Sequence, residues 1–278
     1  MIALAQDLPE VRRLESLASR STTPCGPDAT MVWRRWGEGP ALFLLHGGSG
    51  AWNHWIRNID VLARQRTVWA ADLPGCGESG LPHGAYDADS IHHHVAAGIA
   101  LCAPGEAIEL AGFSFGSLVA GLIAADHPAL IKTLILVAPP ALGIRGPKLE
   151  LKSLGRTMPA EEHERTVRHN LAALMLHDAN AIDDEAVSLH AANFARDRLR
   201  LRRLARTDLM TRLQRRWKCA VHAIWGREDI LVRQSVDRLP SSLAHCDLRS
   251  HALIDNAGHW AQYEQPEAFH AALLATLR

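Results

Sequence analysis

The sequence has neither a long apolar run nor an excess of charge of one sign. No window approaches the ~18 to 20 unbroken apolar residues of a membrane span, and residues 1–20 carry too many charged side chains for a secretory signal. Thirty Lys and Arg residues balance thirty Asp and Glu residues, whereas a protein that coats nucleic acid needs net positive charge. The 47% hydrophobic content excludes a disordered chain. We therefore expect a globular protein with no membrane and no nucleic-acid partner.

Cysteine pairs are also missing. The five cysteines are odd in number and form no C-x-x-C pair, which favours reduced thiols and a cytoplasmic location over a disulfide framework or a zinc site. Sixteen histidines invite a metal interpretation, above all the run His92, His93 and His94. That run falls on a predicted helix, where consecutive residues point in different directions and should not converge on one ion. We therefore predict no metal site and no cofactor.

No internal repeat or low-complexity linker divides the chain, and short apolar runs alternate with helical patterns. This alternation predicts parallel strands joined by crossover helices. The predicted strands are residues 29–36, 41–45, 67–71, 107–111, 131–138, 220–225 and 248–254. The predicted helices of the same unit are residues 53–65, 87–103, 117–126, 232–239 and 266–277. The fold class is therefore α/β.

The alternation stops at Pro139 and Pro140. From residue 141 to about residue 217 there is no convincing buried strand, only helical stretches such as 161–176 and 184–204. We expect residues 1–139 and 218–278 to form an α/β core, and residues 140–217 to form a helical cap over a site. A second packing layer is the alternative.

Residues 112–116, with the sequence GFSFG, fit the G-x-S-x-G nucleophile elbow between a strand and a helix. Such an elbow exposes the serine, here Ser114, at the carboxyl edge of the sheet. A serine hydroxyl is a weak nucleophile near neutral pH, so it needs a base and an acid that orients the base. The motif predicts the chain order serine, acid, histidine.

The residues that follow two later strands complete that order. Asp229 follows the strand 220–225, and His259 follows the strand 248–254. Glu228 is adjacent to Asp229 and would point elsewhere, while Asp255 precedes the histidine by four residues and is expected to brace its loop. We predict Ser114, Asp229 and His259 as the catalytic triad.

An acyl-transfer site also needs donors for an oxyanion. Residues 46–50, with the sequence HGGSG, follow the strand 41–45, where the fold supplies one backbone N–H. We predict Gly48 as that donor and Phe115, the residue after the nucleophile, as the other. His46 is expected to brace the loop, and residues 72–79 to form a structural turn. Cys76 in that turn has no evident basic partner and is expected to be unreactive.

These motifs, in this order and spacing, resemble the α/β-hydrolase family over nearly the whole chain. The matching stretches are HGGSG, DLPGCGES, GFSFGS, WGREDILV and the final GHW. The resemblance implies a mostly parallel eight-stranded sheet flanked by helices, with an inserted helical cap. It also implies the same triad, and a homodimer as one oligomeric state to test.

Residues 258–269 look like the meta-cleavage-product hydrolases, which hydrolyse a carbon–carbon bond in diketo acids from aromatic-ring breakdown. That resemblance implies Trp260 near the substrate, with Gly47 and Phe113 also lining the site. A cap arginine binds the substrate carboxylate in that subfamily, and Arg196 is the candidate. The chain departs from the subfamily at Phe113, where asparagine is usual, and in the absence of a proline from its glycine-rich loop.

Residues 196–216 hold nine arginines and two aspartates, a net charge of +7 that leaves −7 for the rest of the chain. Such a segment steers an anionic substrate, or forms an exposed face of salt bridges. One or two of its arginines could face inward. We predict a serine hydrolase of a small, anionic carbonyl compound, with a ring-fission product as the candidate substrate. The alternatives are a carboxylesterase or cofactor-free perhydrolase, and a catalytically feeble hydrolase-fold receptor.

Overall fold

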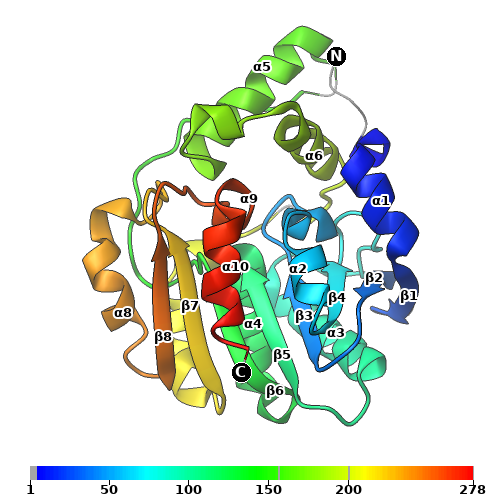
Figure 1. The fold of residues 1–278 in the computed structure, drawn as a ribbon, viewed down its shortest axis with the longest axis vertical. Helices are drawn as coiled ribbons and strands as arrows, with labels where there is room; N and C mark the ends of the chain where they lie inside the picture. Colours follow the sequence, from blue (N-terminus) through cyan, green and yellow to red (C-terminus); the bar gives the residue numbers. More distant parts are fainter. Residues whose placement is uncertain (1–4, 156, 200, 278) are drawn as a thin grey trace.

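The computed structural model describes residues 5–155, 157–199 and 201–277 and contains one eight-stranded sheet (Figure 1). Its strands lie in the order β1-β2-β4-β3-β5-β6-β7-β8. β2 pairs antiparallel with β1 and β4, and all other pairs are parallel. The strands are β1 (Ser19–Pro24), β2 (Thr30–Trp36), β3 (Ala41–Leu45), β4 (Thr67–Asp72), β5 (Ile108–Phe113), β6 (Ile131–Val137), β7 (Ala220–Gly226) and β8 (Leu248–Ile254).

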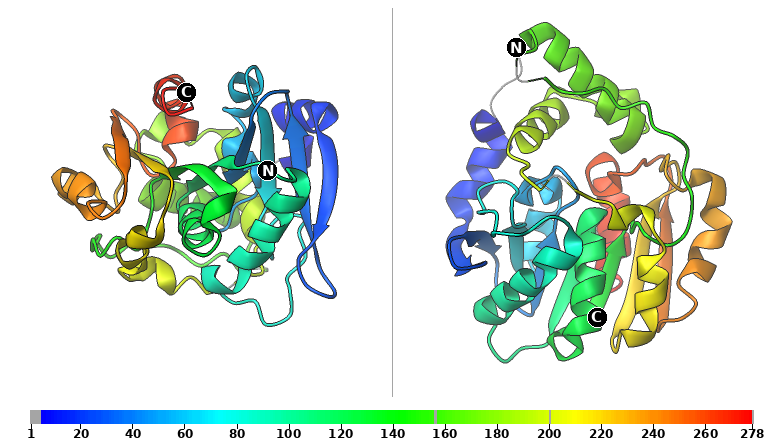
Figure 2. Two further views of the ribbon diagram at one scale, coloured as in Figure 1. Left: turned by 90° about the horizontal axis from the view of Figure 1, so that it is seen from below. Right: turned by 180° about the vertical axis from the view of Figure 1, so that it is seen from behind.

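Helices cover both faces of the sheet. Figures 1 and 2 show α3 and α4 on one face and α2 and α10 on the other. The helices are α1 (Pro9–Leu17), α2 (Ile59–Ala63), α3 (Ala88–Cys102), α4 (Phe115–Asp126), α5 (Ala160–Asn170), α6 (Asp184–Ala195), α7 (Leu209–Leu213), α8 (Leu239–Ser242), α9 (Ala261–Glu264) and α10 (Pro266–Leu274). The predicted α/β fold with a mostly parallel eight-stranded sheet is therefore confirmed.

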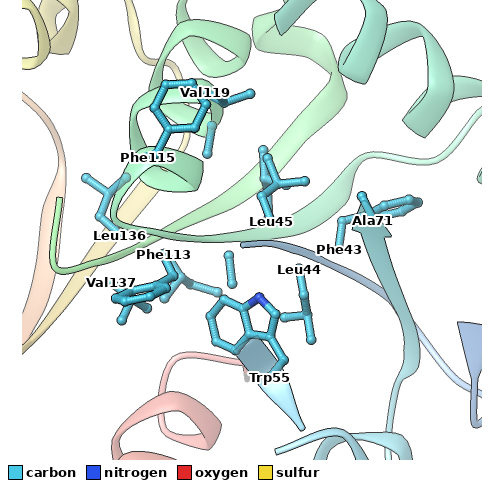
Figure 3. Packing of buried hydrophobic residues seen from close by; sticks show 14 of the residues in the cluster. Phe43, Leu44, Leu45, Trp55, Ala71, Phe113, Phe115, Val119, Leu136 and Val137 are labelled. Atoms are coloured by element: carbon cyan, nitrogen blue, oxygen red, sulfur yellow. The ribbon is translucent and has the colours of Figure 1, made fainter. Parts of the chain in front are cut away.

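The central strands are apolar because both of their faces are covered. Every residue of β3 and β5 is buried. Successive side chains of a strand point to opposite faces, and in Figure 3 Leu45 lies on the side of Val119 in α4, whereas Leu44 lies on the side of Trp55. The core thus fixes the strands whose carboxyl ends carry the site.

The first strand was not predicted, although the expected strand count was right. β1 has the sequence SRSTTP, and Thr23 is its one buried residue. As an edge strand paired only with β2, it needs no apolar face, so hydrophobic periodicity cannot detect it.

Four predicted helices differ from the structure, and the predicted helix 232–239 is a kinked 3₁₀ segment, η8 (Arg233–Arg238), followed by the short α8. The predicted helix 184–204 is wrong beyond Ala195, where α6 ends. Residues 53–65 form a 3₁₀ helix, η2 (Trp52–Trp55), and the short α2 instead of one helix. The predicted helix 161–176 changes after α5 into a π-helical turn, η4 (Leu171–Met175). Such turns often occur at functional sites.

Between β6 and β7 the described residues form helices and connecting segments, with no strand. In Figure 1, α5 and α6 of this segment lie above the sheet at the top of the view. Among the described residues no helix is both long and apolar enough to cross a membrane.

Candidate active site

Ser114 lies in a sharp turn between β5 and α4. Its backbone has φ 49° and ψ −114°, a left-handed conformation that L-residues rarely adopt. The flanking glycines make the turn feasible: a Cβ atom on Gly112 would lie 2.4 Å from the carbonyl oxygen of Gly116, and one on Gly116 would lie 2.4 Å from that of Leu45. The G-x-S-x-G pattern is therefore a steric requirement of this elbow.

A hydrogen-bonded chain links Ser114 to His259 and Asp229. His259 Nε2 lies 2.9 Å from Ser114 Oγ, and His259 Nδ1 lies 2.7 Å from Asp229 Oδ2. The other carboxylate oxygen of Asp229 accepts the N–H of Leu231 at 2.9 Å. Asp229 and His259 are both buried. The structure thus brings the three predicted residues together in the geometry by which a base activates a serine.

The competing carboxylate of Asp255 lies elsewhere. Asp255 forms an exposed ion pair with Arg227, 2.5 Å from its Nε, on the turns that follow β8 and β7. This contact agrees with the predicted bracing role of Asp255. Glu228 has its backbone N–H bonded to the carbonyl of Ala257, which joins the same two turns.

Two backbone N–H groups at the cavity lack partners. Within the described residues neither the Gly48 nor the Phe115 N–H forms a hydrogen bond. Phe115 is the first residue of α4, where a helix leaves its N–H groups free and its dipole favours negative charge. Gly47 differs, because its N–H donates to His54 Nδ1 at 3.2 Å.

His46 and His54 hold this glycine loop in place. His46 Nε2 accepts the N–H of Leu73 at 2.9 Å, which confirms that His46 braces the loop. His54, a residue that sequence analysis missed, also accepts the Trp260 indole N–H on its carbonyl oxygen at 2.9 Å. It therefore connects the loop carrying Gly48 to the segment carrying His259.

The predicted structural turn at residues 72–79 is confirmed by its hydrogen bonds. Asp72 accepts the N–H groups of Trp52 at 2.9 Å and Glu78 at 3.0 Å. Burial raises the pKa of Cys76 in this turn, so the thiol stays protonated, as expected of an unreactive cysteine.

A cavity of about 210 Å³ opens in front of Ser114 and His259. Gly48 and Phe115 also line it, and Leu174 and Met175 of η4 contribute from the segment between β6 and β7. The remaining lining residues are Ser49, Phe113, Pro140, Arg202, Ala205 and Leu231. The cavity is smaller than the roughly 300 Å³ at which pockets for drug-sized ligands begin, so it suits a small substrate.

Of the four residues predicted to bind substrate, two lie at or next to this cavity and two do not. Phe113 lines the cavity and packs against His259, with ring centroids 5.2 Å apart, and Gly47 lies directly against Phe113. The structure does not bring Trp260 or Arg196 to this cavity. Trp260 is fully buried and stacks on Tyr263. Arg196 is exposed and lines a separate cavity of about 370 Å³.

Arg202, instead of Arg196, lines this cavity. Its Nη2 lies 2.6 Å from Asp197 Oδ2, which also accepts the Ser49 hydroxyl at 2.7 Å. Its guanidinium lies 5.2 Å from the centre of the Phe115 ring, and its buried Nε has no hydrogen-bond partner in the described part of the chain. A Cβ atom on Gly48 would lie 2.9 Å from that Nε.

The other arginines of residues 196–216 are not equivalent to Arg202. Arg212 and Arg216 form exposed ion pairs with Asp208 and Asp126, as the salt-bridge alternative predicts. Arg200 lies outside the described residues.

The structure contradicts the expectation that the side chains of the histidine run all point in different directions. His92 Nε2 lies 2.8 Å from Asp126 Oδ2, and His93 Nδ1 lies 3.0 Å from His127 Nε2. The prediction that these consecutive residues point apart was wrong for His92 and His93, whose ring centroids are 3.8 Å apart. Both side chains reach the C-terminal end of α4, which packs beside α3.

A family model described as the alpha/beta hydrolase family matches residues 42–272, which is most of the chain and includes the whole elbow and triad. The chain belongs to the α/β-hydrolase family.

Curated relatives of this α/β-hydrolase include two kinds of enzyme. A pimeloyl-[acyl-carrier protein] methyl ester esterase from Aeromonas hydrophila is 30% identical over 254 residues, covering 84% of this chain and 94% of the relative. A 2-hydroxymuconate semialdehyde hydrolase from Pseudomonas sp. (strain CF600) is 30% identical over 261 residues, covering 87% of this chain and 86% of the relative.

Solved structures share the α/β-hydrolase fold. The esterase RhEst1 from Rhodococcus sp. ECU1013 matches with a TM-score of 0.77 at 21% identity, covering 92% of this chain and 98% of that one. The meta-cleavage product hydrolase from Pseudomonas fluorescens IP01 matches with a TM-score of 0.73 at 22% identity, covering 92% and 97%. At these identities the likeness concerns the fold.

Two buried histidines and one half-buried histidine near the site of this α/β-hydrolase predict loss of stability in acid. Burial lowers the pKa of His46 and His54, and lowers the pKa of His190 in α6 to about 4. An unfolded histidine titrates near 6.5, so between about pH 6.5 and 4 the unfolded chain binds more protons. The contribution of these neutral histidines to the free energy of unfolding is fully present above about pH 6.5. The urea midpoint should therefore fall as the pH drops from about 6.5 to 4.

Histidine variants check this expectation. His190→Gln should flatten the decline in the urea midpoint between pH 7 and 4.5, whereas His251→Gln, at an exposed position, should leave the slope unchanged. An equal slope in wild type and His190→Gln would contradict the role of His190.

Proposed function

We propose that this protein is a serine hydrolase in which Ser114 is the nucleophile, His259 the base, and Asp229 the residue that orients the base. The observation that carries the proposal is the 2.9 Å contact between Ser114 Oγ and His259 Nε2 at the wall of a cavity. The unpartnered N–H groups of Gly48 and Phe115 on the same cavity support it as an oxyanion hole.

The reaction follows from these positions. His259 Nε2 accepts the hydroxyl proton as Ser114 Oγ attacks the substrate carbonyl carbon, and the oxyanion accepts hydrogen bonds from Gly48 and Phe115. The proton then passes from His259 to the leaving group, and an acyl-enzyme remains. His259 next takes a proton from water, which attacks the acyl carbon. The bond between Ser114 Oγ and the acyl carbon then breaks, His259 returns the proton to Ser114, and the acid is released. Asp229 keeps the Nδ1 proton in place and stabilises the imidazolium.

The substrate that we propose is a small carbonyl compound with a carboxylate, cleaved at a carbon–carbon bond next to its carbonyl. Arg202 supports the carboxylate, because it lines the cavity beside Gly48 and its Nε has no hydrogen-bond partner among the described residues. The 2-hydroxymuconate semialdehyde hydrolase relative supports this bond type. The methyl ester esterase relative supports the alternative, a carboxylesterase or perhydrolase that uses the same residues.

We also propose that residues 140–217 act as a cap. Pro140, Leu174, Met175, Arg202 and Ala205 of this segment line the cavity opposite Ser114. Asp197 accepts the Ser49 hydroxyl and thus ties the segment to the glycine loop. A cap in this position would exclude water from the reacting atoms.

A fluorophosphonate probe tests the assignment as a serine hydrolase. We expect stoichiometric labelling, located on Ser114 by peptide mass spectrometry, and turnover of p-nitrophenyl acetate with a burst. Wild-type protein that neither reacts with the probe nor cleaves esters would instead be a hydrolase-fold receptor. Loss of the visible absorbance of dienoate ring-fission products would select the carbon–carbon hydrolase, whereas ester cleavage alone would select the esterase.

Arg202→Gln should selectively weaken the use of carboxylate-bearing substrates. Because a hydrogen bond to a charged group contributes about 1.5–3 kcal/mol, KM for such a substrate should rise roughly tenfold to a hundredfold. KM for a neutral ester of the same size should change little. The matched control is Arg203→Gln, at an exposed position, which should leave both values unchanged. Equal effects on charged and neutral substrates would contradict the assigned role of Arg202.

A further inference from the structure

A cluster of metal-ligating side chains lies between α3 and the C-terminal end of α4, apart from the catalytic residues. Ligand atoms of His92, His93 and Asp126 all lie within 4.8 Å of one another. His127 joins the cluster through its Nε2, which lies 3.0 Å from His93 Nδ1. His92 is buried and His93 is exposed.

Both ring nitrogens of His92 lie next to oxygen atoms that accept hydrogen bonds. Its Nδ1 lies 3.0 Å from the carbonyl oxygen of Asp89, and its Nε2 lies 2.8 Å from Asp126 Oδ2. Both partners are acceptors, but a neutral imidazole has a single N–H. With the Nδ1 proton donated to Asp89, the Nε2 lone pair faces a carboxylate oxygen. A cation between the two would satisfy both.

The spacing of these atoms suits a small tetrahedral ion. Zinc binds histidine nitrogen and carboxylate oxygen at about 2.0–2.2 Å, which places neighbouring ligand atoms roughly 3.3 Å apart. The 2.8 Å separation of His92 Nε2 and Asp126 Oδ2 is close to that value, and the ligand atoms of His92, His93 and Asp126 all lie within 4.8 Å of one another. Imidazole ligands favour zinc, copper and nickel over magnesium or calcium.

We propose that His92, His93 and Asp126 form a binding site for a divalent transition-metal ion such as Zn²⁺. Arg216 pairs with Asp126 through Oδ1 and leaves Oδ2 facing His92. The exposed His93 gives the ion a path from solvent, and the buried His92 anchors it.

The site would join two helices without taking part in the reaction. α4 has Ser114 before its first residue and Asp126 as its last, and 12 residues of α-helix extend over about 18 Å. An ion bound only by the folded chain stabilises it in proportion to the logarithm of the ion concentration over Kd. Zn²⁺ should therefore raise the melting temperature and need not change the turnover of small esters.

Cobalt spectroscopy and zinc titration test the proposal on the full chain. Co²⁺ should give the visible absorption of a tetrahedral complex, and calorimetry with Zn²⁺ should give one site per chain. His93→Ala and, separately, Asp126→Asn should weaken Zn²⁺ binding at least about tenfold and abolish the thermal stabilisation. His94→Ala is the matched control, because His94 is the neighbouring histidine outside the cluster, and should bind Zn²⁺ as the wild type does.

Three results would overturn the proposal. The first is Zn²⁺ binding that His93→Ala and Asp126→Asn leave unchanged. The second is Zn²⁺ binding that is lost in His259→Ala but kept in His93→Ala, since the ion would then occupy the catalytic histidine. The third is the absence of Co²⁺ and Zn²⁺ binding in the wild-type protein. Each result is independent of whether Ser114 proves to be the nucleophile.

Discussion

Ser114→Ala is expected to lower kcat for a short p-nitrophenyl ester by about 10⁶-fold. The substitution removes the one oxygen that lies 2.9 Å from His259 Nε2, so no acyl-enzyme can form. Residual hydrolysis should come from water activated by His259 and from the N–H groups of Gly48 and Phe115. Steady-state rates together with the burst amplitude measure the effect, and the burst should vanish.

The variant also has to be folded. The elbow holds Ser114 in a left-handed conformation that is strained for any residue other than glycine. The melting temperature should therefore be recorded for each protein, to show that Ser114→Ala is folded. Ser241→Ala, at an exposed position far along the chain, is the control and should retain wild-type activity. If Ser114→Ala kept a burst of wild-type amplitude, another residue would be the nucleophile.

The elbow could be predicted from the sequence because its geometry is local. Gly112 and Gly116 lie two residues to either side of Ser114. A Cβ on Gly112 would meet Gly116 and Ser117 within the same turn, and only the Cβ of Gly116 would meet a distant segment, at Leu45 and His46. The order of Ser114, Asp229 and His259 could be predicted for a related reason. Parallel strands end at a common edge of the sheet, so residues that follow β5, β7 and β8 meet there whatever the intervening sequence.

The inward arginine could not be predicted, because its position depends on contacts distant in the sequence. Asp197 holds Arg202 and also bonds to Ser49, which lies 148 residues away in the chain. The described residues between Ala195 and Leu204 form no helix, so a helical period assigns their side chains to the wrong faces. The charge pattern showed that this segment was unusual, and only the tertiary structure separates Arg202 from Arg196.

For the histidine run, the sequence-based rule excluded a contact that the structure contains. A rule for side-chain directions on one helix excluded a common ion for His92 and His93. Long side chains on adjacent positions can nevertheless meet when a second helix supplies partners, as the end of α4 does through Asp126 and His127. The rule concerns pairs within one helix, and this cluster is formed between two.

Asp229→Asn is expected to lower kcat by about 10⁴-fold while leaving the fold intact. Asp229 Oδ2 lies 2.7 Å from His259 Nδ1 and accepts its proton, which leaves Nε2 free to accept the proton of Ser114. The amide group of asparagine can instead donate to Nδ1 and so favour the tautomer with the proton on Nε2. That tautomer cannot act as a base towards Ser114, and no carboxylate remains to stabilise the imidazolium.

Rates of ester turnover and of fluorophosphonate labelling should both fall in Asp229→Asn, because each requires a deprotonated Ser114. The matched control is Asp255→Asn: this carboxylate lies four residues before His259 but pairs with Arg227 on the surface, so its loss should leave kcat nearly unchanged. A large loss in Asp255→Asn with full activity in Asp229→Asn would move the acid of the triad to Asp255. Because the two variants make the same chemical change, their difference isolates the 2.7 Å contact with His259 as the cause.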